Sequence, residues 1–236
     1  GYTAVTNYPT GIYRKKATYS FIGDNSPTVA GGLFNPASFS EATLEQDNTI
    51  VATTWQKNAE ITLYDVNSHA LEATDINGNY AATRLDAKNE RVISTVANAR
   101  FGEFTASGFE STNEGDVIVA GTLSDGLGTP LTKSHSGGKM VKTTGAQMAC
   151  SYTGSSHSPR KYKVSFWSSS PTVQVVFAGN NTPKVVGTYG SWYLMEALVD
   201  VSAGNFTAQV KSLATGTTDV YFDDFRVHPV DATMTS

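Results

Sequence analysis

The clearest pattern in the chain is an alternation of apolar and polar side chains at residues 160–168. The apolar set is Tyr162, Val164 and Phe166, with polar positions between them. Because successive side chains of a strand point to opposite faces, this alternation predicts a half-buried β-strand. Trp167 continues the polar set, so we expect its ring to face away from the core or into a groove.

Similar short runs follow this strand along the second half of the chain. They lie at 173–177, 192–201, 206–210 and 220–222, and Pro, Gly and Asn residues separate them. Strands spaced by roughly 8–12 residues with turns between them are typical of an antiparallel sandwich or barrel. The sequence therefore predicts an all-β fold in this half.

The first 107 residues are also β-like, with a different rhythm. Short strands are predicted at 48–52, 60–64 and 91–96, and a helical turn capped by Ser40 at 38–46. The segment 75–79, Asp-Ile-Asn-Gly-Asn, predicts a tight turn because Asn-Gly favours positive φ. We expect a β-rich segment at 1–107, a sandwich at 108–230 and a polar linker at 231–236. Since the chain lacks an initial Met, we expect it to be part of a longer protein whose downstream region is missing.

Composition narrows the class of protein. The 236 residues carry 17 Lys and Arg against 21 Asp and Glu, and only 16% are charged, compared with roughly 25% in ordinary soluble chains. That composition disfavours helical bundles with charged faces. The chain has no run of about 18 apolar residues, so the sequence predicts no membrane-spanning helix. The net charge of −4 argues against a nucleic-acid-binding surface.

Sequence motifs of enzymes are missing. The histidines His69, His135, His157 and His228 are far apart and lack zinc-ligand spacing. Neither a Gly-x-Ser-x-Gly elbow nor a phosphate-binding loop is present. Cys150 has no histidine at a telling spacing, so we expect a buried, inert thiol rather than a nucleophile. The sequence predicts a non-catalytic protein.

Two Tyr/Leu-Asp pairs mark the N-terminal half. Tyr64-Asp65 and Leu85-Asp86 stand 21 residues apart, and Gly78 follows Tyr64 by 14. This spacing resembles a YD repeat of the Rhs family. Together with segments 8–14, 68–73, 98–100 and 108–110, it resembles the region that precedes repeat arrays in large surface proteins of Bacteroidota. The resemblance implies a bacterial protein that is secreted or displayed on the cell surface.

A change of phase marks residues 220–227. Val220 and Phe222 share one strand face, and Phe225 and Val227 share another that is out of phase with it. A β-bulge at Asp223-Asp224 would restore a common core face, so we predict one there. The segment resembles the last strand of jelly-roll carbohydrate-binding modules, whose earlier Phe-Glu and His-Ser-Gly motifs match 109–110 and 135–137 here.

The resemblance to those modules implies a structural calcium ion. It assigns Glu110 and Asp223 as side-chain ligands, with backbone carbonyls near Gly138 and Lys139. Carboxylates and carbonyls suit Ca²⁺, which takes six to eight oxygen ligands. The alternative is a polar bulge without metal, in which Glu110 pairs with Arg226.

Sugar binding requires exposed aromatic rings that stack on pyranose faces, together with amides or carboxylates for the hydroxyl groups. The candidate rings are Trp167, Tyr189, Trp192 and Tyr193. Trp192 begins a strand after Gly190-Ser191, so we expect it to pack into the core. We therefore predict glycan contact by Trp167, with Asn180 and Asn181 on a nearby turn.

These observations predict a non-catalytic structural or adhesive segment of a large secreted protein, whose jelly roll binds a glycan. The expected partners are a glycan or polysaccharide, downstream repeats, or copies of the chain itself. Two alternatives stay open: a dedicated polysaccharide-binding module, and part of an Rhs-type toxin shell. A rigid spacer that binds nothing is also consistent with a sandwich of this shape.

Overall fold

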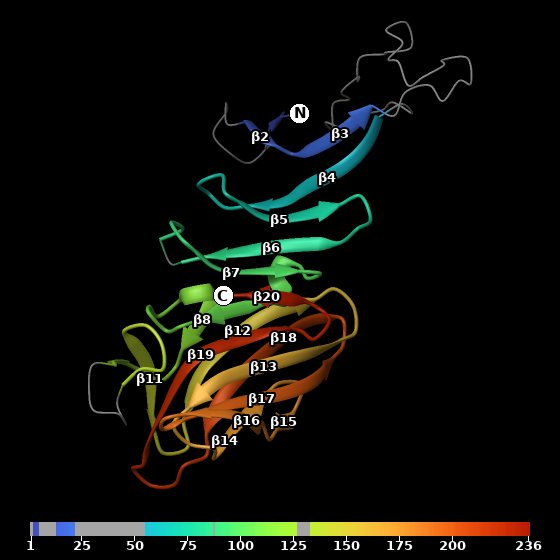
Figure 1. The fold of residues 1–236 in the computed structure, drawn as a ribbon. Helices are drawn as coiled ribbons and strands as arrows, with labels where there is room; N and C mark the ends of the chain where they lie inside the picture. Colours follow the sequence, from blue (N-terminus) through green and yellow to red (C-terminus); the bar gives the residue numbers. More distant parts are fainter. Residues whose placement is uncertain (1, 5–12, 22–54, 87, 127–132) are drawn as a thin grey trace, which may run out of the picture. The chain divides into compact units, whose positions relative to one another are not determined.

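The computed structural model of the chain describes residues 2–4, 13–21, 55–86, 88–126 and 133–236. Within them the chain is almost entirely β-structure (Figure 1). The helical turn predicted at 38–46 and the strand predicted at 48–52 lie outside the described residues. No helix among the described residues is long and apolar enough to cross a membrane.

Two compact units divide the chain, residues 1–80 and 81–236. The first contains β1 (Tyr2–Ala4), β2 (Tyr13–Lys15), β3 (Ala17–Phe21), β4 (Trp55–Tyr64) and β5 (Ala70–Asp75). Strand β1 pairs with β2, and β3, β4 and β5 form an antiparallel meander. The predicted strand at 60–64 is confirmed as the end of β4.

The predicted tight turn at 75–79 is confirmed, and it has a counterpart after β4. Asp75 Oδ1 accepts hydrogen bonds from the Asn77 and Asn79 amides at 2.8 Å each, and Gly78 has φ +80°. Asp65 accepts in the same way from the amides two and four residues later. In both turns the carboxylate satisfies backbone groups that the strand ladder leaves unpaired.

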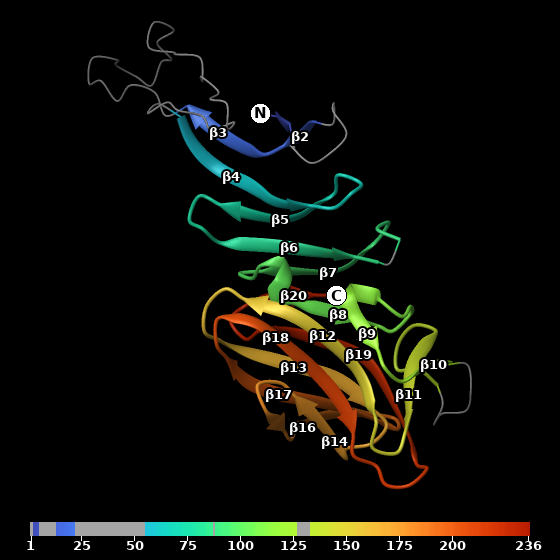
Figure 2. The same ribbon diagram turned by 180° about the vertical axis from the view of Figure 1, so that it is seen from behind.

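The second unit is a jelly-roll β-sandwich with a small meander beside it (Figures 1 and 2). One sheet has the order β10-β11-β19-β13-β17-β16, with β8 also on β19; the other has the order β15-β14-β18-β12-β9. Its strands are β8 (Thr105–Ser107), β9 (Val117–Val119), β10 (Thr122–Asp125), β11 (Lys139–Thr144), β12 (Met148–Ser156), β13 (Arg160–Ser168), β14 (Val173–Val176), β15 (Asn180–Asn181), β16 (Lys184–Tyr189), β17 (Trp192–Val201), β18 (Gly204–Ser212) and β19 (Asp219–Pro229).

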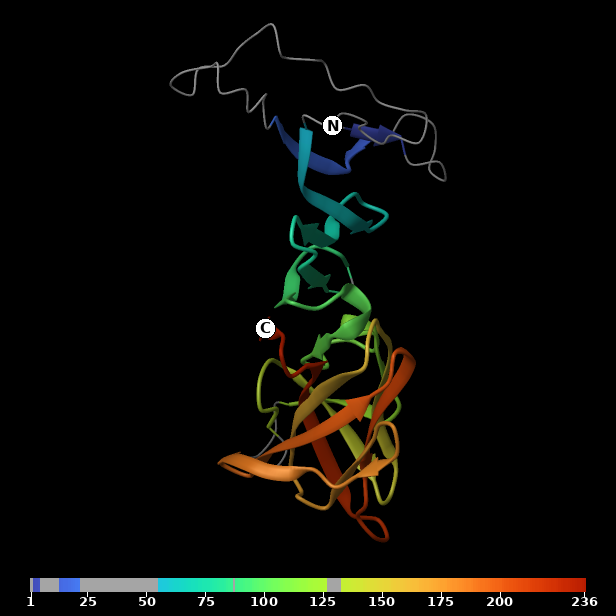
Figure 3. The same ribbon diagram turned by 90° about the vertical axis from the view of Figure 1, so that its right-hand side faces the viewer.

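The core of the sandwich lies between these two sheets, which Figure 3 shows from the side. Tyr162, Val164 and Phe166 are buried in it, as the alternation on β13 predicted. From the opposite sheet, Val175, Phe206 and Val210 meet them, among others. Tyr162 packs edge-on against Phe206 at 5.1 Å between ring centroids. The expected antiparallel sandwich is confirmed.

The predicted bulge is present in β19. Ser165 of β13 pairs with Arg226 and Trp167 pairs with Asp223, so the two residues Asp224 and Phe225 face one residue of β13. Asp224 adopts φ +50°, which absorbs the extra residue. Val220, Phe222, Phe225 and Val227 are consequently all buried in the core.

The second compact unit begins earlier than the expected boundary at 107/108. Strands β6 (Tyr80–Leu85) and β7 (Val92–Ala97) stand beside β20 (Thr233–Thr235) in the sheet order β20-β7-β6. Thus residues 233–235, expected in a linker, form a strand on β7. Burial explains the shift, because Ala82, Val96, Ala99, Phe104 and Ala232 form a second, smaller core.

Arg84 of β6 fixes this meander to the sandwich. Its side chain is only 3% exposed and donates to the carbonyl oxygens of Phe104 at 2.7 Å and Phe101 at 2.9 Å. It also donates to the Tyr152 hydroxyl at 3.0 Å, forms an ion pair with Asp116, and lies over the Phe101 ring at 4.3 Å. A planar guanidinium can serve all these partners at once, whereas an ammonium group cannot.

We predict that Arg84→Met lowers the free energy of unfolding by about 3 kcal/mol, because buried acceptors lose their donor. Arg91→Met is the matched control, since the Arg91 side chain is 77% exposed, and its cost should stay within about 0.5 kcal/mol. Urea unfolding of both variants measures the difference. Equal costs would show that the Arg84 network does not hold the meander in place.

Candidate functional site

At the bulge of β19 the adjacent side chains of Asp223 and Asp224 point in different directions, Asp223 into the protein and Asp224 toward the surface. Asp223 is completely buried, and its oxygens accept hydrogen bonds from the Ser136 amide at 3.0 Å and the Asp224 amide at 2.8 Å. Burial raises the pKa of Asp223 to about 7. Among the described residues no Lys, Arg or His forms an ion pair with Asp223. This carboxylate therefore lacks the positive partner that a buried charge requires.

Glu110 meets the same loop from the start of the sandwich. The preceding Phe109 is buried with φ +58°, and Glu110 Oε1 accepts from the amides of Gly138 at 2.8 Å and Lys139 at 3.2 Å. Two carboxylates from opposite ends of the sandwich sequence thus converge on the loop 136–139. The alternative ion pair between Glu110 and Arg226 is not formed in the part of the chain that the structure describes.

The groups at this loop provide some of the oxygen ligands that a hard cation such as Ca²⁺ requires. Two carboxylates without cationic partners are what Ca²⁺ prefers. The amides of Gly138 and Lys139, rather than their carbonyls, face Glu110, and the Gly138 carbonyl accepts from the Gly126 amide at 2.8 Å. Among the described residues, no three His, Cys, Asp or Glu side chains form a metal-binding group. The calcium ligands Glu110, Asp223, Gly138 and Lys139 stay a prediction.

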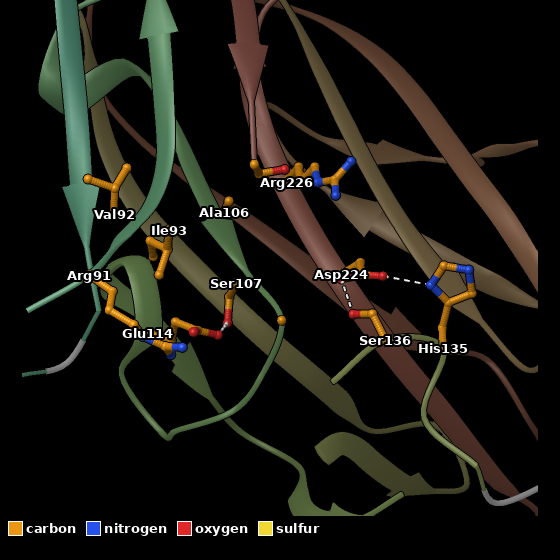
Figure 4. A pocket seen from close by; sticks show the side chains of 12 residues that line it. Arg91, Val92, Ile93, Ala106, Ser107, Glu114, His135, Ser136, Asp224 and Arg226 are labelled. Carbon is orange, nitrogen blue, oxygen red and sulfur yellow. Dashed lines mark hydrogen bonds and ion pairs between the residues drawn. The ribbon is translucent and has the colours of Figure 1, made fainter. Parts of the chain in front are cut away.

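Asp224 points the other way and holds His135 (Figure 4). Its Oδ2 lies 2.7 Å from His135 Nδ1, and its Oδ1 accepts from the Ser136 hydroxyl at 2.7 Å. The imidazole lies nearly flat on the Trp167 indole, with 4.0 Å between centroids and 18° between planes. The bulge therefore sets the position of a ring on the outward face of the sheet.

Four rings gather on that face, which we call the aromatic face: His135, Trp167, Tyr189 and Trp192. Tyr189 and Trp192 meet His135 edge-on, at 5.8 and 6.3 Å between centroids. Trp192 is buried, and its Nε1 donates to the Lys133 carbonyl at 3.2 Å. It is not among the described residues of the core cluster between the sheets. Tyr189 is 69% exposed, so it offers the most open ring of the four.

The structure separates the predicted glycan residues into two groups. Trp167 lies on the sheet of β13, facing outward as predicted. Asn180 and Asn181 form β15 on the other sheet, and the Asn181 amide donates to the Phe177 and Gly179 carbonyls at 2.8 and 3.2 Å. The side-chain amide of Asn181 therefore donates its hydrogen bonds within its own turn. The described geometry does not bring these amides to Trp167.

The site also contains residues that the sequence reasoning missed. His135 was assigned only to a turn, although it covers one face of Trp167. Glu114 is buried and accepts from the Ser107 hydroxyl and the Glu110 amide, each at 3.3 Å. An acidic residue four positions after Glu110 was the available signal. Cys150, by contrast, is buried as expected, and burial raises the pKa of its thiol.

Solved structures to which the chain is distantly similar include carbohydrate-binding modules. No family model matches the chain, and no curated protein matches it. Among solved structures, the chain is similar to the CBM35 of Cellvibrio japonicus Abf62, with 18% identity, TM-score 0.38, and coverage of 56% of this chain and 96% of that one. A family 35 module from an environmental isolate gives 13% identity, TM-score 0.37, and coverage of 56% and 97%. The C-terminal CBM6 of LamC from Zobellia galactanivorans gives 15% identity, TM-score 0.32, and coverage of 53% and 98%.

We predict that Gly137→Ala destabilises the loop far more than its backbone angle alone explains. Gly137 has φ +57°, and a Cβ there would lie 1.9 Å from Glu110 Oε1. The matched control is Gly216→Ala, which has φ +64° and open space around the Cβ. Left-handed strain costs each variant about 1 kcal/mol. Gly137→Ala should lose about 2 kcal/mol more, because Glu110 can move away from the new methyl group only by giving up the amides of Gly138 and Lys139. Equal losses in denaturant unfolding would contradict the packing of Glu110 on this loop.

Proposed function

We propose that the jelly roll is a non-catalytic glycan-binding module that uses the aromatic face. The observation that carries this proposal is the group of four rings on the outward side of a sheet, with Tyr189 largely open to solvent. Sugars present apolar C–H faces that stack on such rings. Apolar rings gathered on an outward face, with one of them open to solvent, often mark a binding surface.

The rings are also held in place before any ligand arrives. Asp224 fixes the His135 imidazole, and the Lys133 carbonyl fixes the Trp192 indole. Side chains that are already ordered lose little conformational entropy on binding. His135 covers one face of Trp167, so the sugar contacts Tyr189 and the remaining exposed surface of Trp167. Asn180 and Asn181, on the other sheet, are proposed only as a secondary contact.

We predict that Tyr189→Ala and Trp167→Ala each weaken glycan binding about tenfold, since one stacking contact is worth roughly 0.5–1.5 kcal/mol beyond its buried area. A glycan array identifies the ligand and calorimetry measures the affinity. Ile118→Ala is the control, because Ile118 is 59% exposed on the other sheet. An array without signal for the unmodified chain, or binding that both substitutions leave unchanged, would contradict the proposal.

We also propose that calcium supports this module structurally. Glu110 and Asp223 would supply carboxylate ligands, with carbonyls near Gly138 and Lys139. The support is the convergence of both carboxylates on the loop 136–139, together with the missing cationic partner of Asp223 in the described structure. The ion would balance their charge and hold the loop 136–139, which directly follows His135.

We predict that saturating calcium raises the melting temperature and that a chelator reverses the rise. At a concentration 100 times the dissociation constant, the stabilisation is about 2.7 kcal/mol, or several degrees for a unit of this size. Asp223→Asn should abolish the calcium response, whereas Asp200→Asn, whose side chain is 83% exposed, should keep it. A melting temperature that calcium does not change would rule the site out.

A second candidate is a rigid spacer or shell segment within a larger extracellular bacterial protein, of the Rhs type or another. The meander of the first unit favours it, because Asp65 and Asp75 end successive strands with the same turn. Strand β3 also ends the strand order among the described residues of that unit, which leaves an edge for further pairing. A glycan array that gives no signal with the unmodified chain, and the same result with Trp167→Ala, would favour this function.

A further inference from the structure

Two basic side chains lie beside Trp167 on the outward face of the sheet of β13. Lys163 shares the face of Trp167 on that strand, since strand side chains alternate between faces. Arg226 of β19 pairs with Ser165, the residue midway between them on that face. Two residues of a strand span about 7 Å, so a ligand that lies on Trp167 can extend to the basic pair, as we call Lys163 and Arg226.

The guanidinium group of Arg226 lacks an acidic partner. Among the described residues, no Asp or Glu forms an ion pair with it. Asp224, two residues earlier on β19, binds His135 and Ser136 instead. A guanidinium group without a carboxylate is a suitable partner for an anion, because its N–H groups match two oxygens of a carboxylate or a sulfate.

Glu196 of β17 reduces the positive charge at the basic pair without cancelling it. Its carboxylate lies 4.0 Å from Lys163 Nζ, and Glu196 also pairs in register with Lys184 of β16. Burial lowers the pKa of His228 on the same face, and Lys163 and Arg226 lower it further, against a smaller opposite effect of Glu196. The positive charges therefore outweigh the negative one at this part of the sheet.

We propose that the glycan bound on the aromatic face is acidic, and that Arg226 and Lys163 bind its carboxylate or sulfate group while a sugar ring lies on Trp167. This inference rests on the proposed glycan-binding function and names the class of glycan. The chain as a whole carries a net charge of −4, so a basic pair that no carboxylate neutralises is not a general property of its surface.

The test is a calorimetric titration of the whole chain with two matched pairs of oligosaccharides. One pair is trigalacturonate and its carboxyl-reduced form, and the other is a sulfated galactan oligosaccharide and its desulfated form. We expect the acidic member of at least one pair to bind at least tenfold more tightly than its neutral counterpart, and added salt to weaken only the acidic member. The pair that responds distinguishes a carboxylate from a sulfate.

Two results of this titration would overturn the inference. Neutral members that bind as tightly as the acidic ones would overturn the acidic class and leave the glycan-binding function standing. Binding by none of the four probes would also overturn it, and the glycan array then decides separately on the glycan-binding function.

Substitutions locate the acidic group on the sheet. Arg226→Gln should weaken binding of the preferred acidic oligosaccharide at least tenfold and leave its neutral counterpart unchanged, whereas Arg226→Lys keeps the charge and should restore part of the affinity. Lys161→Gln is the matched control, because Lys161 lies on the same face of β13, is 52% exposed and pairs with Asp200 at 3.5 Å. Tyr189→Ala should weaken both members of a pair alike. A folded Arg226→Gln variant that keeps full affinity for the acidic oligosaccharide would contradict the assignment.

Discussion

The bulge in β19 is the constraint on which the rest of the second unit depends. It adds one residue opposite Phe166, and this addition keeps four large side chains of β19 in a single core. The same addition buries Asp223 while Asp224 remains at the surface, 14% exposed. A strand without the bulge would place either the apolar pairs or the carboxylates on the wrong face. Core packing and the chemistry of the loop 134–139 are therefore consequences of one backbone irregularity.

Three carboxylates then hold the loop 136–139 and the neighbouring His135 in place. Asp223 and Glu110 accept hydrogen bonds from its backbone amides, and Asp224 binds the side chains of His135 and Ser136. His135, which directly precedes the loop, stacks on Trp167 of the aromatic face. The aromatic face and the proposed calcium site thus both rely on a segment whose position is fixed by side-chain hydrogen bonds. Recognition on a loop held by a rigid scaffold is common in proteins.

Local features of the fold could be predicted from the sequence, and long-range ones could not. Alternation predicted β13, and the phase change at 220–227 predicted the bulge, because both depend on the period of two in a strand. Glu110 and Asp223 both accept hydrogen bonds from the loop 136–139, and their role as calcium ligands stays a prediction. In contrast, no local pattern indicates that His135 lies on Trp167, since the contact joins a loop to a distant strand. The contacts of Arg84 have no local signal for a similar reason, because three other segments contribute the groups that it bonds.

The most direct test of the account is a crystal structure of the whole chain, grown with calcium and with the oligosaccharide that gives the strongest array signal. The account predicts a sugar ring stacked against Tyr189 or the open surface of Trp167, on the outward face of the sheet of β13. It also predicts that His135 keeps its contact with Asp224 beside that sugar. An oligosaccharide bound only to the opposite sheet, near Asn180 and Asn181, would contradict the account.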